Sequence, residues 1–352
     1  MPMSTRYASI TGWGKYAPPR VVTNDDLAEH MDTSDEWIRS RSGIRERRFV
    51  GDDESTATMS AASGRAALDR AGVDPQEVDL ILVATSSPDY LTPPVSSQVQ
   101  YLIGADEVGA MQITVGCTGF VYALVTAQQF IQTGAYDTVL VIGTELISRW
   151  ISYDNRSTAV LFGDGSGAVI MQATDEPCGI TGYVLGSDGS GAEHIIVPAG
   201  GVAQPPTHKA IDDDLINIKM NGREVFKFAT RIMGQALEES LAAAGRGVDD
   251  IDLFVPHQAN RRIIEYAAEQ AGIPLEKVAI NVDRYGNTSA ASVPLALAEA
   301  FDDGRVQPGD TLALVAFGAG LTWASAIFEL AADLPVLQRV GPSSEEPAPA
   351  HP

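Results

Sequence analysis

The sequence is poor in the features that mark several common classes of protein. Its only two cysteines, Cys117 and Cys178, stand in unrelated contexts, which excludes a disulfide framework and favours a reducing compartment such as the cytoplasm. Its five histidines are scattered and no CxxC or HExxH motif occurs, so we expect neither a metal nor a resident cofactor. No apolar run approaches the length of a membrane span, and the N-terminal residues lack the apolar core of a signal peptide.

Basic residues are also scarce. The chain carries 24 Lys and Arg against 46 Asp and Glu, a formal net charge of −22 at pH 7. A surface this acidic repels phosphate backbones and anionic headgroups, so we expect neither nucleic acid nor a membrane as a partner. Only a local basic patch could bind an anionic partner. One cluster of arginines stands out, as either a solvated charged face or an anion site: Arg39, Arg41, Arg45, Arg47 and Arg48.

What the chain does contain is the composition of an enzyme with a large core, with 45% hydrophobic and 20% charged residues. Short β-branched runs alternate with Ala-rich helical segments, which predicts an α/β protein with buried, largely parallel strands. The second half repeats this order. Asp79 and Asp252 each precede a buried strand, and they are separated by the same number of positions as Asp137 and Asp310, which precede a second pair of strands.

We infer a duplicated α/β unit from this repeat. The predicted boundaries are an N-terminal half, 1–174, a C-terminal half, 175–332, and a tail, 333–352. The tail is rich in Pro, Ser, Ala and Glu and is predicted to be mobile. A further stretch, 202–214, reads as a loop.

The chain is organised around the stretch from Gln112 to Phe120. A β-branched run, Ile113–Val115, ends before Cys117, and the segment after the cysteine is apolar at helical spacing. We therefore expect Cys117 at a turn between a buried strand and a helix N-terminus, where free N–H groups and the helix dipole favour the nucleophilic thiolate. The alternative is a buried structural thiol, but the glycines on both sides of the Cys–Thr pair favour a reactive one.

Two residues of the second half could complete a nucleophilic site. His257 follows the predicted strand 251–255, at the end of the strand where parallel sheets bind ligands. Asn287 holds nearly the position in the second half that Cys117 holds in the first. Acyl transfer through a thioester needs a Cys and a His, and Asn can donate a hydrogen bond without competing for a proton. The glycine-rich turn Phe317–Gly320 could supply backbone N–H groups to an oxyanion.

Several motifs carry a resemblance to a known family, and they extend over nearly the whole chain. They are Asp32-Thr-Ser-Asp-Glu-Trp-Ile38, Gly43-Ile-Arg-Glu-Arg47, Gly116-Cys-Thr-Gly-Phe120, Phe162-Gly-Asp-Gly-Ser-Gly167, Val255-Pro-His-Gln-Ala-Asn260, Gly286-Asn-Thr-Ser-Ala-Ala-Ser292 and Ala316-Phe-Gly-Ala-Gly320. With these motifs the chain resembles the β-ketoacyl-(acyl carrier protein) synthase III family of thiolase-like condensing enzymes. The resemblance implies an αβαβα thiolase-like fold in five layers, built from two duplicated α/β halves, and a homodimer.

The resemblance also implies an activity. It is the decarboxylating condensation of an acyl-CoA primer with malonyl-acyl carrier protein, which starts fatty acid synthesis and uses coenzyme A thioester as a substrate without a cofactor. Cys117 would be the nucleophile, and His257 and Asn287 would stabilise the enolate. The backbone N–H groups of Cys117 and Ala319 would form the oxyanion hole.

The resemblance assigns binding residues as well. Coenzyme A would contact Thr33, Trp37, Arg41, Arg156, Phe226 and Asn260, with the adenine sandwiched between Trp37 and Arg156. The acidic carrier protein would dock on Arg223, Lys227 and Arg262. The acyl pocket would include Thr92 and Phe317.

The chain departs from the family pattern at a few positions. Gln112 stands where many relatives have Asp, for which we expect a structural consequence, and Ala319 and Leu321 replace a frequent Gly and Phe. Thr92 falls where some members that use short primers carry a bulky aromatic residue of the partner subunit. A smaller residue there favours a medium, longer or branched primer over acetyl.

Other functions share these motifs. One is a paralogue of secondary metabolism, either a starter-unit ketosynthase of a polyketide pathway or an acyltransferase with another acceptor. A thiol hydrolase is a further alternative, but it would need water in the site. A non-catalytic carrier-binding scaffold is a third, and the intact set of Cys117, His257 and Asn287 argues against it.

Overall fold

Two sheets form the framework of the protein, whose computed structural model describes residues 6–334. The first sheet has five strands in the order β1-β7-β6-β4-β5, namely β1 (Tyr7–Tyr16), β4 (Leu80–Ala84), β5 (Gly109–Ile113), β6 (Thr138–Glu145) and β7 (Gly165–Thr174). The second has four strands in the order β11-β12-β13-β8, namely β8 (Gly179–Ser187), β11 (Leu253–Pro256), β12 (Thr311–Gly318) and β13 (Thr322–Glu329). Two small ribbons pair β2 (Arg20–Thr23) with β3 (Glu46–Phe49), and β9 (Ile195–Ile196) with β10 (Lys219–Met220).

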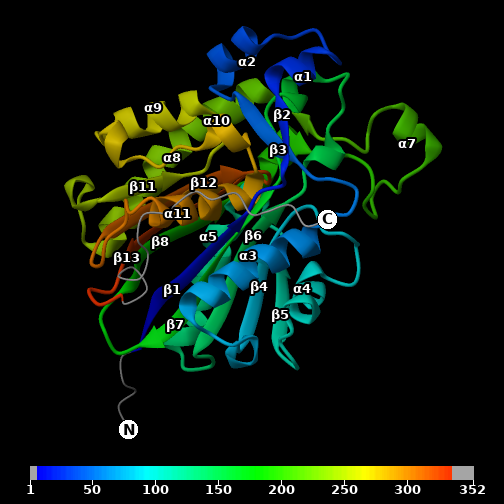
Figure 1. Cartoon of the computed structure of the whole chain (residues 1–352). Coiled ribbons are helices and arrows are strands. Elements are labelled where there is room, and N and C mark those ends of the chain that lie inside the picture. The colour runs from blue at the N-terminus through cyan, green and yellow to red at the C-terminus, as the bar shows by residue number, and fades with distance from the viewer. Residues whose placement is uncertain (1–5, 335–352) are drawn as a thin grey trace.

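Helices cover the outer faces of the sheets and fill the space between them (Figure 1). Between the sheets, α5 (Gly119–Gln132) and α11 (Ser292–Asp302) contact strands of both. The first sheet is covered outside by α3 (Thr56–Ala71) and α4 (Val95–Ile103), and the second by α8 (Gly222–Ala244) with α9 (Arg261–Ala271) beside it. This order of layers is the αβαβα arrangement that the motifs predicted. The remaining helices are short: α1 (Asn24–Ala28), α2 (Asp35–Ser42), α6 (Arg156–Ala159), α7 (His208–Asp212) and α10 (Val282–Tyr285).

The repeated aspartates make equivalent contacts in the two halves. Oδ2 of Asp79 accepts hydrogen bonds of 2.8 Å from the backbone N–H groups of Asp137 and Thr138, where β6 begins. Oδ2 of Asp252 accepts a bond of 2.9 Å from the N–H of Thr311, where β12 begins. In each half, therefore, one carboxylate ties the start of a strand to its parallel neighbour.

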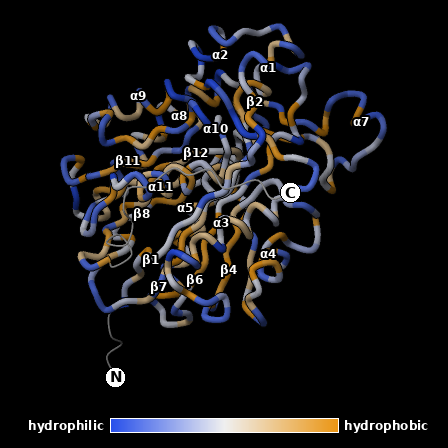
Figure 2. Tube along the Cα trace, viewed as in Figure 1, coloured by the Kyte–Doolittle hydropathy of each residue, from blue (hydrophilic) through white to orange (hydrophobic). Residues whose placement is uncertain are grey.

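The central strands are apolar because both of their faces are covered. Every residue of β6 and of β12 is buried, as the continuous apolar runs in the sequence predicted. Figure 2 shows hydrophobic residues concentrated along β4 and β6. Phe120 on α5, Phe301 on α11 and Phe328 on β13 belong to one core cluster, which joins both sheets through the two central helices.

Four predictions need correction or fall outside the structure. The strands were expected to be largely parallel, but only the pairs β4–β5, β4–β6 and β11–β12 are parallel, and the pairs β1–β7, β6–β7, β12–β13 and β8–β13 are antiparallel. The strand before Cys117 was expected to be buried, but β5 ends at Ile113 and is only partly buried, with Met111 39% exposed, because it is an edge strand. The predicted loop 202–214 contains the short helix α7. Apart from Asp333 and Leu334, the predicted tail lies outside the described residues.

None of the helices within residues 6–334 combines the length and the apolar character needed to cross a bilayer.

Candidate active site

The three residues predicted to form the reactive set line one cavity of about 590 Å³. Cys117 comes from the first half of the chain, and His257 and Asn287 come from the second. Most of the wall is apolar, and it includes Ile147, Trp150, Val160, Leu161, Phe162, Ile195, Val197, Ile218, Met220 and Val225. Such a wall excludes water and strengthens any hydrogen bond formed inside it.

Cys117 lies in a 3₁₀ turn, Gly116–Thr118, that leads directly into α5. Gly116 has a positive φ of 59°, and a Cβ there would lie 3.0 Å from the backbone nitrogen of Ala319. A Cβ on Gly318 would lie 2.6 Å from the backbone nitrogen of Cys117. Glycine is therefore needed at both positions so that the two turns can approach.

This approach brings together the two N–H groups that were predicted to form an oxyanion hole. The backbone N–H groups of Cys117 and Ala319 both lower the pKa of the Cys117 thiol. When the sulfur is bonded to an acyl carbon, the same two N–H groups can donate to the oxygen of that acyl group.

The N–H groups favour the Cys117 thiolate as expected, but burial of the thiol opposes them. Cys117 retains partial exposure, yet burial among the surrounding atoms is the largest influence and raises the pKa of its thiol to about 12. The Ser289 hydroxyl and the two amides lower this pKa, and the carboxylate of Glu145 raises it further. Desolvation therefore outweighs the donors at the helix N-terminus, and the resting residue is a neutral thiol.

His257 follows β11 and is fixed on two sides. Its backbone N–H donates to the carbonyl of Val315 over 2.7 Å, and its Nδ1 lies 2.6 Å from the Ser292 hydroxyl. Ser292 Oγ accepts the Gln258 N–H over 3.3 Å, and we assign its own O–H to Nδ1, which puts the imidazole proton on Nε2. Burial lowers the pKa of His257 to about 3, so the ring is neutral near pH 7.

Asn287 is held by its backbone and by one end of its side chain. Its N–H donates to Leu161 O over 2.8 Å, and its own carbonyl accepts the N–H of Gly163 over 3.1 Å. Its Oδ1 accepts the N–H of Ser289 over 2.9 Å, which leaves the Nδ2 amide as the end available to a ligand. His257 and Asn287 thus both offer neutral N–H donors to the cavity.

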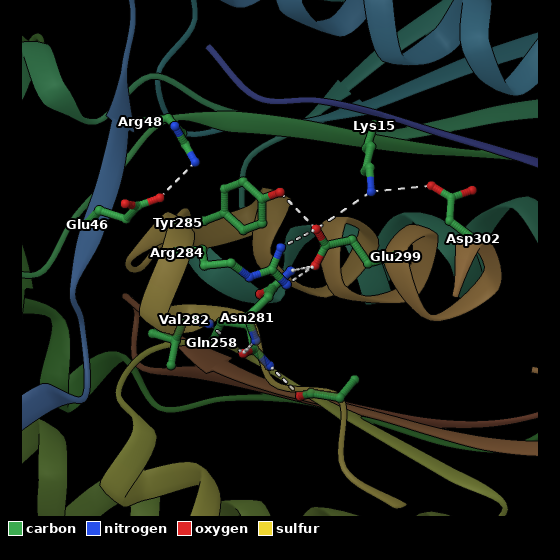
Figure 3. Close-up of polar contacts among 11 residues, drawn as sticks. Lys15, Glu46, Arg48, Gln258, Asn281, Val282, Arg284, Tyr285, Glu299 and Asp302 are labelled. Atoms are coloured by element: carbon green, nitrogen blue, oxygen red, sulfur yellow. Dashed lines mark hydrogen bonds and ion pairs between the residues drawn. The ribbon is translucent and has the colours of Figure 1, made fainter. Parts of the chain in front are cut away.

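A cluster of polar contacts joins α10 to α11 (Figure 3). Arg284 on α10 donates to both carboxylate oxygens of Glu299 on α11, over 3.0 and 2.9 Å. Glu299 also accepts from Asn281 over 2.9 Å and from the Tyr285 hydroxyl over 2.8 Å. The segment that leads to Asn287 is therefore tied to α11.

Gln258, the residue after His257, joins the same segment. Its Oε1 accepts the backbone N–H groups of Asn281 and Val282 over 2.9 and 3.2 Å (Figure 3). Its Nε2 donates to the carbonyl of Ala279 over 3.0 Å. The loops that carry His257 and Asn287 consequently share one hydrogen-bonded support.

The mouth of the cavity contains an aromatic ring between cationic side chains. The guanidinium carbon of Arg41 lies 4.6 Å from the Trp37 ring centroid, and that of Arg156 lies 4.8 Å from it. Arg156 also donates to the backbone carbonyl of Asp32. Arg156 itself lies against the Trp37 ring, so the predicted adenine sandwich requires this arginine to move.

Two of the other three predicted coenzyme A contacts line the cavity, and one does not. Phe226 and Asn260 line the cavity, and Asn260 Nδ2 donates to the Arg41 carbonyl over 3.0 Å. Thr33 does not line it, and its Oγ1 is buried without a hydrogen-bond partner in the described part of the chain.

The residues predicted to dock a carrier protein are exposed beside this mouth. Arg223 and Lys227 lie at the start of α8, and Arg262 lies at the start of α9. The Arg262 guanidinium carbon is 6.0 Å from the ring of Phe226, which ties the two helices together at the cavity rim.

Of the two predicted acyl-pocket residues, one lines the cavity and the other does not. Phe317 lines the cavity with its ring centroid 5.3 Å from that of His257. Thr92 is exposed in the loop before α4 and does not line the cavity of a single chain. Gln112 is structural as expected, because its Oε1 accepts the Val95 N–H over 3.0 Å at the start of α4.

The arginine cluster is not one anion site. Arg47 is fully buried and donates to Asn24 Oδ1 and to the Val160 carbonyl, each over 2.8 Å. Arg39 pairs with Asp35, and Arg48 pairs with Glu46. Only Arg41 of the five lines the cavity, whereas Arg39 and Arg45 line a separate depression together with Arg261.

Sequence reasoning missed Glu145, Ser289 and Ser292. The serines lie inside the motif around Asn287, and their roles depend on contacts with residues far away in the chain. A signal for Glu145 was present, since a carboxylate directly follows an apolar, wholly buried strand core. In the described residues, no group of three or more His, Cys, Asp or Glu is arranged to hold a metal ion.

Comparisons with known proteins give one and the same family, and the matches extend over most of the chain. Residues 111–189 match the model of the family described as 3-oxoacyl-[acyl-carrier-protein (ACP)] synthase III, and residues 241–330 match its C-terminal model. The β-ketoacyl-[acyl-carrier-protein] synthase III of Roseiflexus sp. (strain RS-1) is 48% identical over 91% of this chain and 98% of its own length.

Solved structures agree as well. The 3-oxoacyl-[acyl-carrier-protein] synthase III of Aquifex aeolicus is 40% identical with a TM-score of 0.85, covering 92% of this chain and 99% of that one. The priming β-ketosynthase of the R1128 polyketide pathway is 36% identical with a TM-score of 0.86, covering 93% of this chain and 97% of that one. The thiolase-like fold predicted from the motifs is confirmed, and the chain belongs to the 3-oxoacyl-[acyl-carrier-protein] synthase III family.

Proposed function

We propose that the protein is an acyltransferase that condenses an acyl-CoA primer with malonyl-acyl carrier protein. The products are a 3-oxoacyl-acyl carrier protein, carbon dioxide and free coenzyme A, and the reaction starts fatty acid synthesis. The names of the similar proteins support this activity. The observation that carries the proposal is the convergence of Cys117, His257 and Asn287 on one apolar cavity.

The first half of the reaction is acyl transfer to Cys117. The sulfur attacks the thioester carbonyl of the primer, the bond between that carbon and the coenzyme A sulfur breaks, and coenzyme A leaves as its thiol. The backbone N–H groups of Cys117 and Ala319 would stabilise the tetrahedral oxyanion, since both already lower the pKa of the Cys117 thiol. The product is a covalent acyl-enzyme, as in other ping-pong reactions.

The second half is decarboxylation followed by attack. Loss of carbon dioxide leaves its bonding electrons on the malonyl thioester, whose oxygen becomes an enolate. His257 Nε2–H and the Asn287 amide would donate to that oxygen, and a neutral imidazole with its pKa lowered to about 3 suits a donor that holds its proton. The enolate carbon then attacks the acyl group, and the Cys117 thiolate leaves.

The substrates would enter through the mouth lined by Trp37, Arg41 and Arg156. Arginines beside a tryptophan can bind an adenine ring and the phosphates attached to it, once Arg156 has moved. The carrier protein would dock on Arg223, Lys227 and Arg262, because these cations lie beside the mouth of a chain with a net charge of −22. A local basic rim lets an acidic enzyme bind an acidic partner.

The edge of the first sheet supports a homodimer. Within residues 6–334, β5 pairs with β4 alone, and Tyr101 and Met111 near this edge are 81% and 39% exposed. An open strand edge with exposed apolar neighbours is a surface that a second copy can cover. In such a dimer Thr92 would reach the partner's acyl pocket, so its small side chain supports a medium, longer or branched primer. A cytoplasmic location remains a prediction from the scarcity of cysteine.

A second candidate function is priming in a secondary-metabolite pathway. The similarity to the R1128 priming β-ketosynthase favours it specifically, because that protein matches in sequence and fold over nearly its whole length. The two functions share the chemistry of the cavity and differ in primer and carrier.

Intact-mass spectrometry tests the proposal. The protein is incubated with acetyl-, isobutyryl- and decanoyl-CoA, and then with malonyl-acyl carrier protein. We expect an acyl adduct that is absent in Cys117→Ala and is discharged with release of carbon dioxide. An adduct that ignores every malonyl carrier would contradict condensation, and a strong preference for acetyl-CoA would contradict the larger pocket. Discharge only by the carrier of a polyketide pathway would support the second candidate.

A further inference from the structure

A buried carboxylate lies next to the nucleophile, and no step described so far uses it. Glu145 is the last residue of β6 and is 0% exposed. Buried carboxylates are rare because removing their charge from water is costly unless hydrogen bonds replace the lost solvation. In the described part of the chain, no ion pair links Glu145 to a Lys or an Arg.

Hydroxyl and amide groups surround this carboxylate. The Ser87 hydroxyl donates to Oε2 over 2.6 Å, and the backbone N–H of Ser86 donates to Oε1 over 3.1 Å. The Ser289 hydroxyl also donates to Oε1, over 3.1 Å. The charge of Glu145 raises the pKa of the Cys117 thiol.

Ser289 lies between the two acids. Its hydroxyl donates to Glu145 over 3.1 Å and also lowers the pKa of the Cys117 thiol, and Ser289 and Cys117 line the same cavity. Ser289 has a positive φ of 49°, which a residue with a side chain rarely adopts, and its N–H is held by Asn287. The fold therefore places Oγ of Ser289 between the Cys117 thiol and Oε1 of Glu145.

The thiol needs such a path because His257 is unsuited to take its proton. The Nδ1 of His257 already bonds to Ser292, and its Nε2 carries the proton that the enolate requires. Burial also makes this imidazole a weak base, with its pKa lowered to about 3. The resting thiol must nonetheless lose its proton to attack a thioester.

We propose that Glu145 accepts the Cys117 proton through the Ser289 hydroxyl during acyl transfer, an inference that rests on the proposed function. The thiol proton passes to Ser289 Oγ while the hydroxyl proton passes to Glu145 Oε1. Sγ bonds to the acyl carbon, the bond from that carbon to the coenzyme A sulfur breaks, and the leaving thiolate receives the proton from Glu145. The carboxylate is then restored.

The later steps balance without Glu145. Condensation releases Cys117 as a thiolate, which takes one proton from water. Decarboxylation of a carboxylate consumes one proton overall, and this proton accounts for it. Glu145 suits the earlier exchange because burial raises its pKa to about 6, so it is ionised near neutral pH and is more basic than an exposed carboxylate.

The test is the pH dependence of the acylation rate, measured in single turnovers by quenched-flow and intact mass with a primer accepted by the native enzyme. We expect the native rate to rise with a midpoint near the Glu145 pKa of about 6 and then to level off. In Glu145→Gln the rate near pH 7 should fall by about 100-fold, and the rise should move to alkaline pH, where the thiol ionises by itself. Ser289→Ala should behave in the same way.

Two further variants separate proton transfer from a structural defect. Glu145→Asp keeps the carboxylate and should recover part of the rate together with the acidic midpoint. Ser87→Ala removes a bond to the far oxygen, Oε2, and should move the midpoint upward without abolishing it, because that bond lowers the Glu145 pKa. Decarboxylation of malonyl-CoA by unacylated Glu145→Gln should stay within about twofold of the native rate, since this step uses His257 and Asn287.

Acylation of Glu145→Gln at the native rate with the native pH profile would overturn the relay. Loss of decarboxylation together with acylation in that variant would also count against it, because the defect would then be general. Failure of the native protein to form any adduct is a different result, which refutes the proposed function rather than the relay.

Discussion

The Ser292 hydroxyl lies 2.6 Å from Nδ1 of His257, and it is the first side chain of α11, the helix that also carries Glu299. One helix between the sheets therefore orients the imidazole and anchors the support of Asn287. The relationship matters because a neutral histidine can place its proton on either nitrogen, and only one choice gives a donor in the cavity.

Replacing Ser292 by Ala should impair decarboxylation more than acylation. Without the hydroxyl the imidazole can turn or change tautomer, so we expect malonyl decarboxylation to fall by roughly tenfold or more. The rate at which acyl-enzyme forms should stay within about twofold of the native rate. Carbon dioxide release and intact mass measure the two steps. Ser240→Ala is a matched control, because Ser240 bonds to Ser325 over 2.6 Å between α8 and β13 and does not line the cavity.

The buried imidazole predicts how decarboxylation depends on pH. The pKa of His257 is lowered to about 3, so the ring stays neutral in the range where an exposed histidine titrates. The decarboxylation rate should therefore show no step near the ordinary histidine pKa of about 6.5. A rate that falls with a midpoint there would show that the ring is protonated within the working range.

The same shift predicts an effect on stability. Below about pH 6.5 the unfolded chain binds a proton at this histidine, whereas the folded chain does not until about pH 3. The contribution of His257 is thus fully present above about 6.5 and is lost as pH falls toward 3. The melting temperature of His257→Asn should consequently fall less between about pH 7 and 5 than that of the native protein.

Removing Arg284 should loosen the segment that carries Asn287. The change leaves a largely buried Glu299 with fewer donors, so we expect a loss of stability on the order of 2 kcal/mol and a lower condensation rate. Urea unfolding of Arg284→Ala measures the first effect. Arg246→Ala removes an ion pair with Glu329, a carboxylate that is more exposed than Glu299, and it should leave both properties nearly unchanged.

Replacing Trp37 by Ala should weaken binding of the nucleotide rather than the chemistry. We expect the KM for acyl-CoA to rise by roughly tenfold with little change in kcat. The same acyl group on N-acetylcysteamine, which has no nucleotide, should react equally with both proteins. An equal loss with both substrates would indicate that Trp37 shapes the cavity instead.

Reversing the charge of Lys227 should affect only the carrier-linked substrate. Lys227→Glu places a carboxylate in the basic rim, so the KM for malonyl-acyl carrier protein should rise several-fold at low salt and less at high salt. The KM for malonyl-CoA should not change. Arg246→Glu, beyond the other end of α8, is the matched control for the change in net charge.

The parts of this molecule that follow a local pattern could be predicted from the sequence. The runs that become β6 and β12 are continuous and apolar because both faces are covered, and the repeated aspartates revealed the duplication. The motifs around Cys117, His257 and Asn287 gave the family and the fold, and the three residues do share one cavity. The division at residue 174 and the roles of the site residues stay predictions.

The errors came from the surroundings of a residue, which its own segment does not determine. The helix N-terminus favoured a thiolate at Cys117, but burial by distant segments dominates its pKa. Arg47 looked like part of a basic surface, yet its partners, Asn24 and Val160, come from other elements and bury it. The edge position of β5 likewise depends on strand order, which the spacing of apolar residues cannot reveal.

The division of the site between the two halves has a consequence for refolding. Because α5 and α11 each pack against both sheets, neither the nucleophile nor its partner loops can be positioned until the halves have docked. Helical and sheet signals should therefore recover before the ability of Cys117 to take up an acyl group. Among the properties regained by the refolding chain, enzymatic competence should come last.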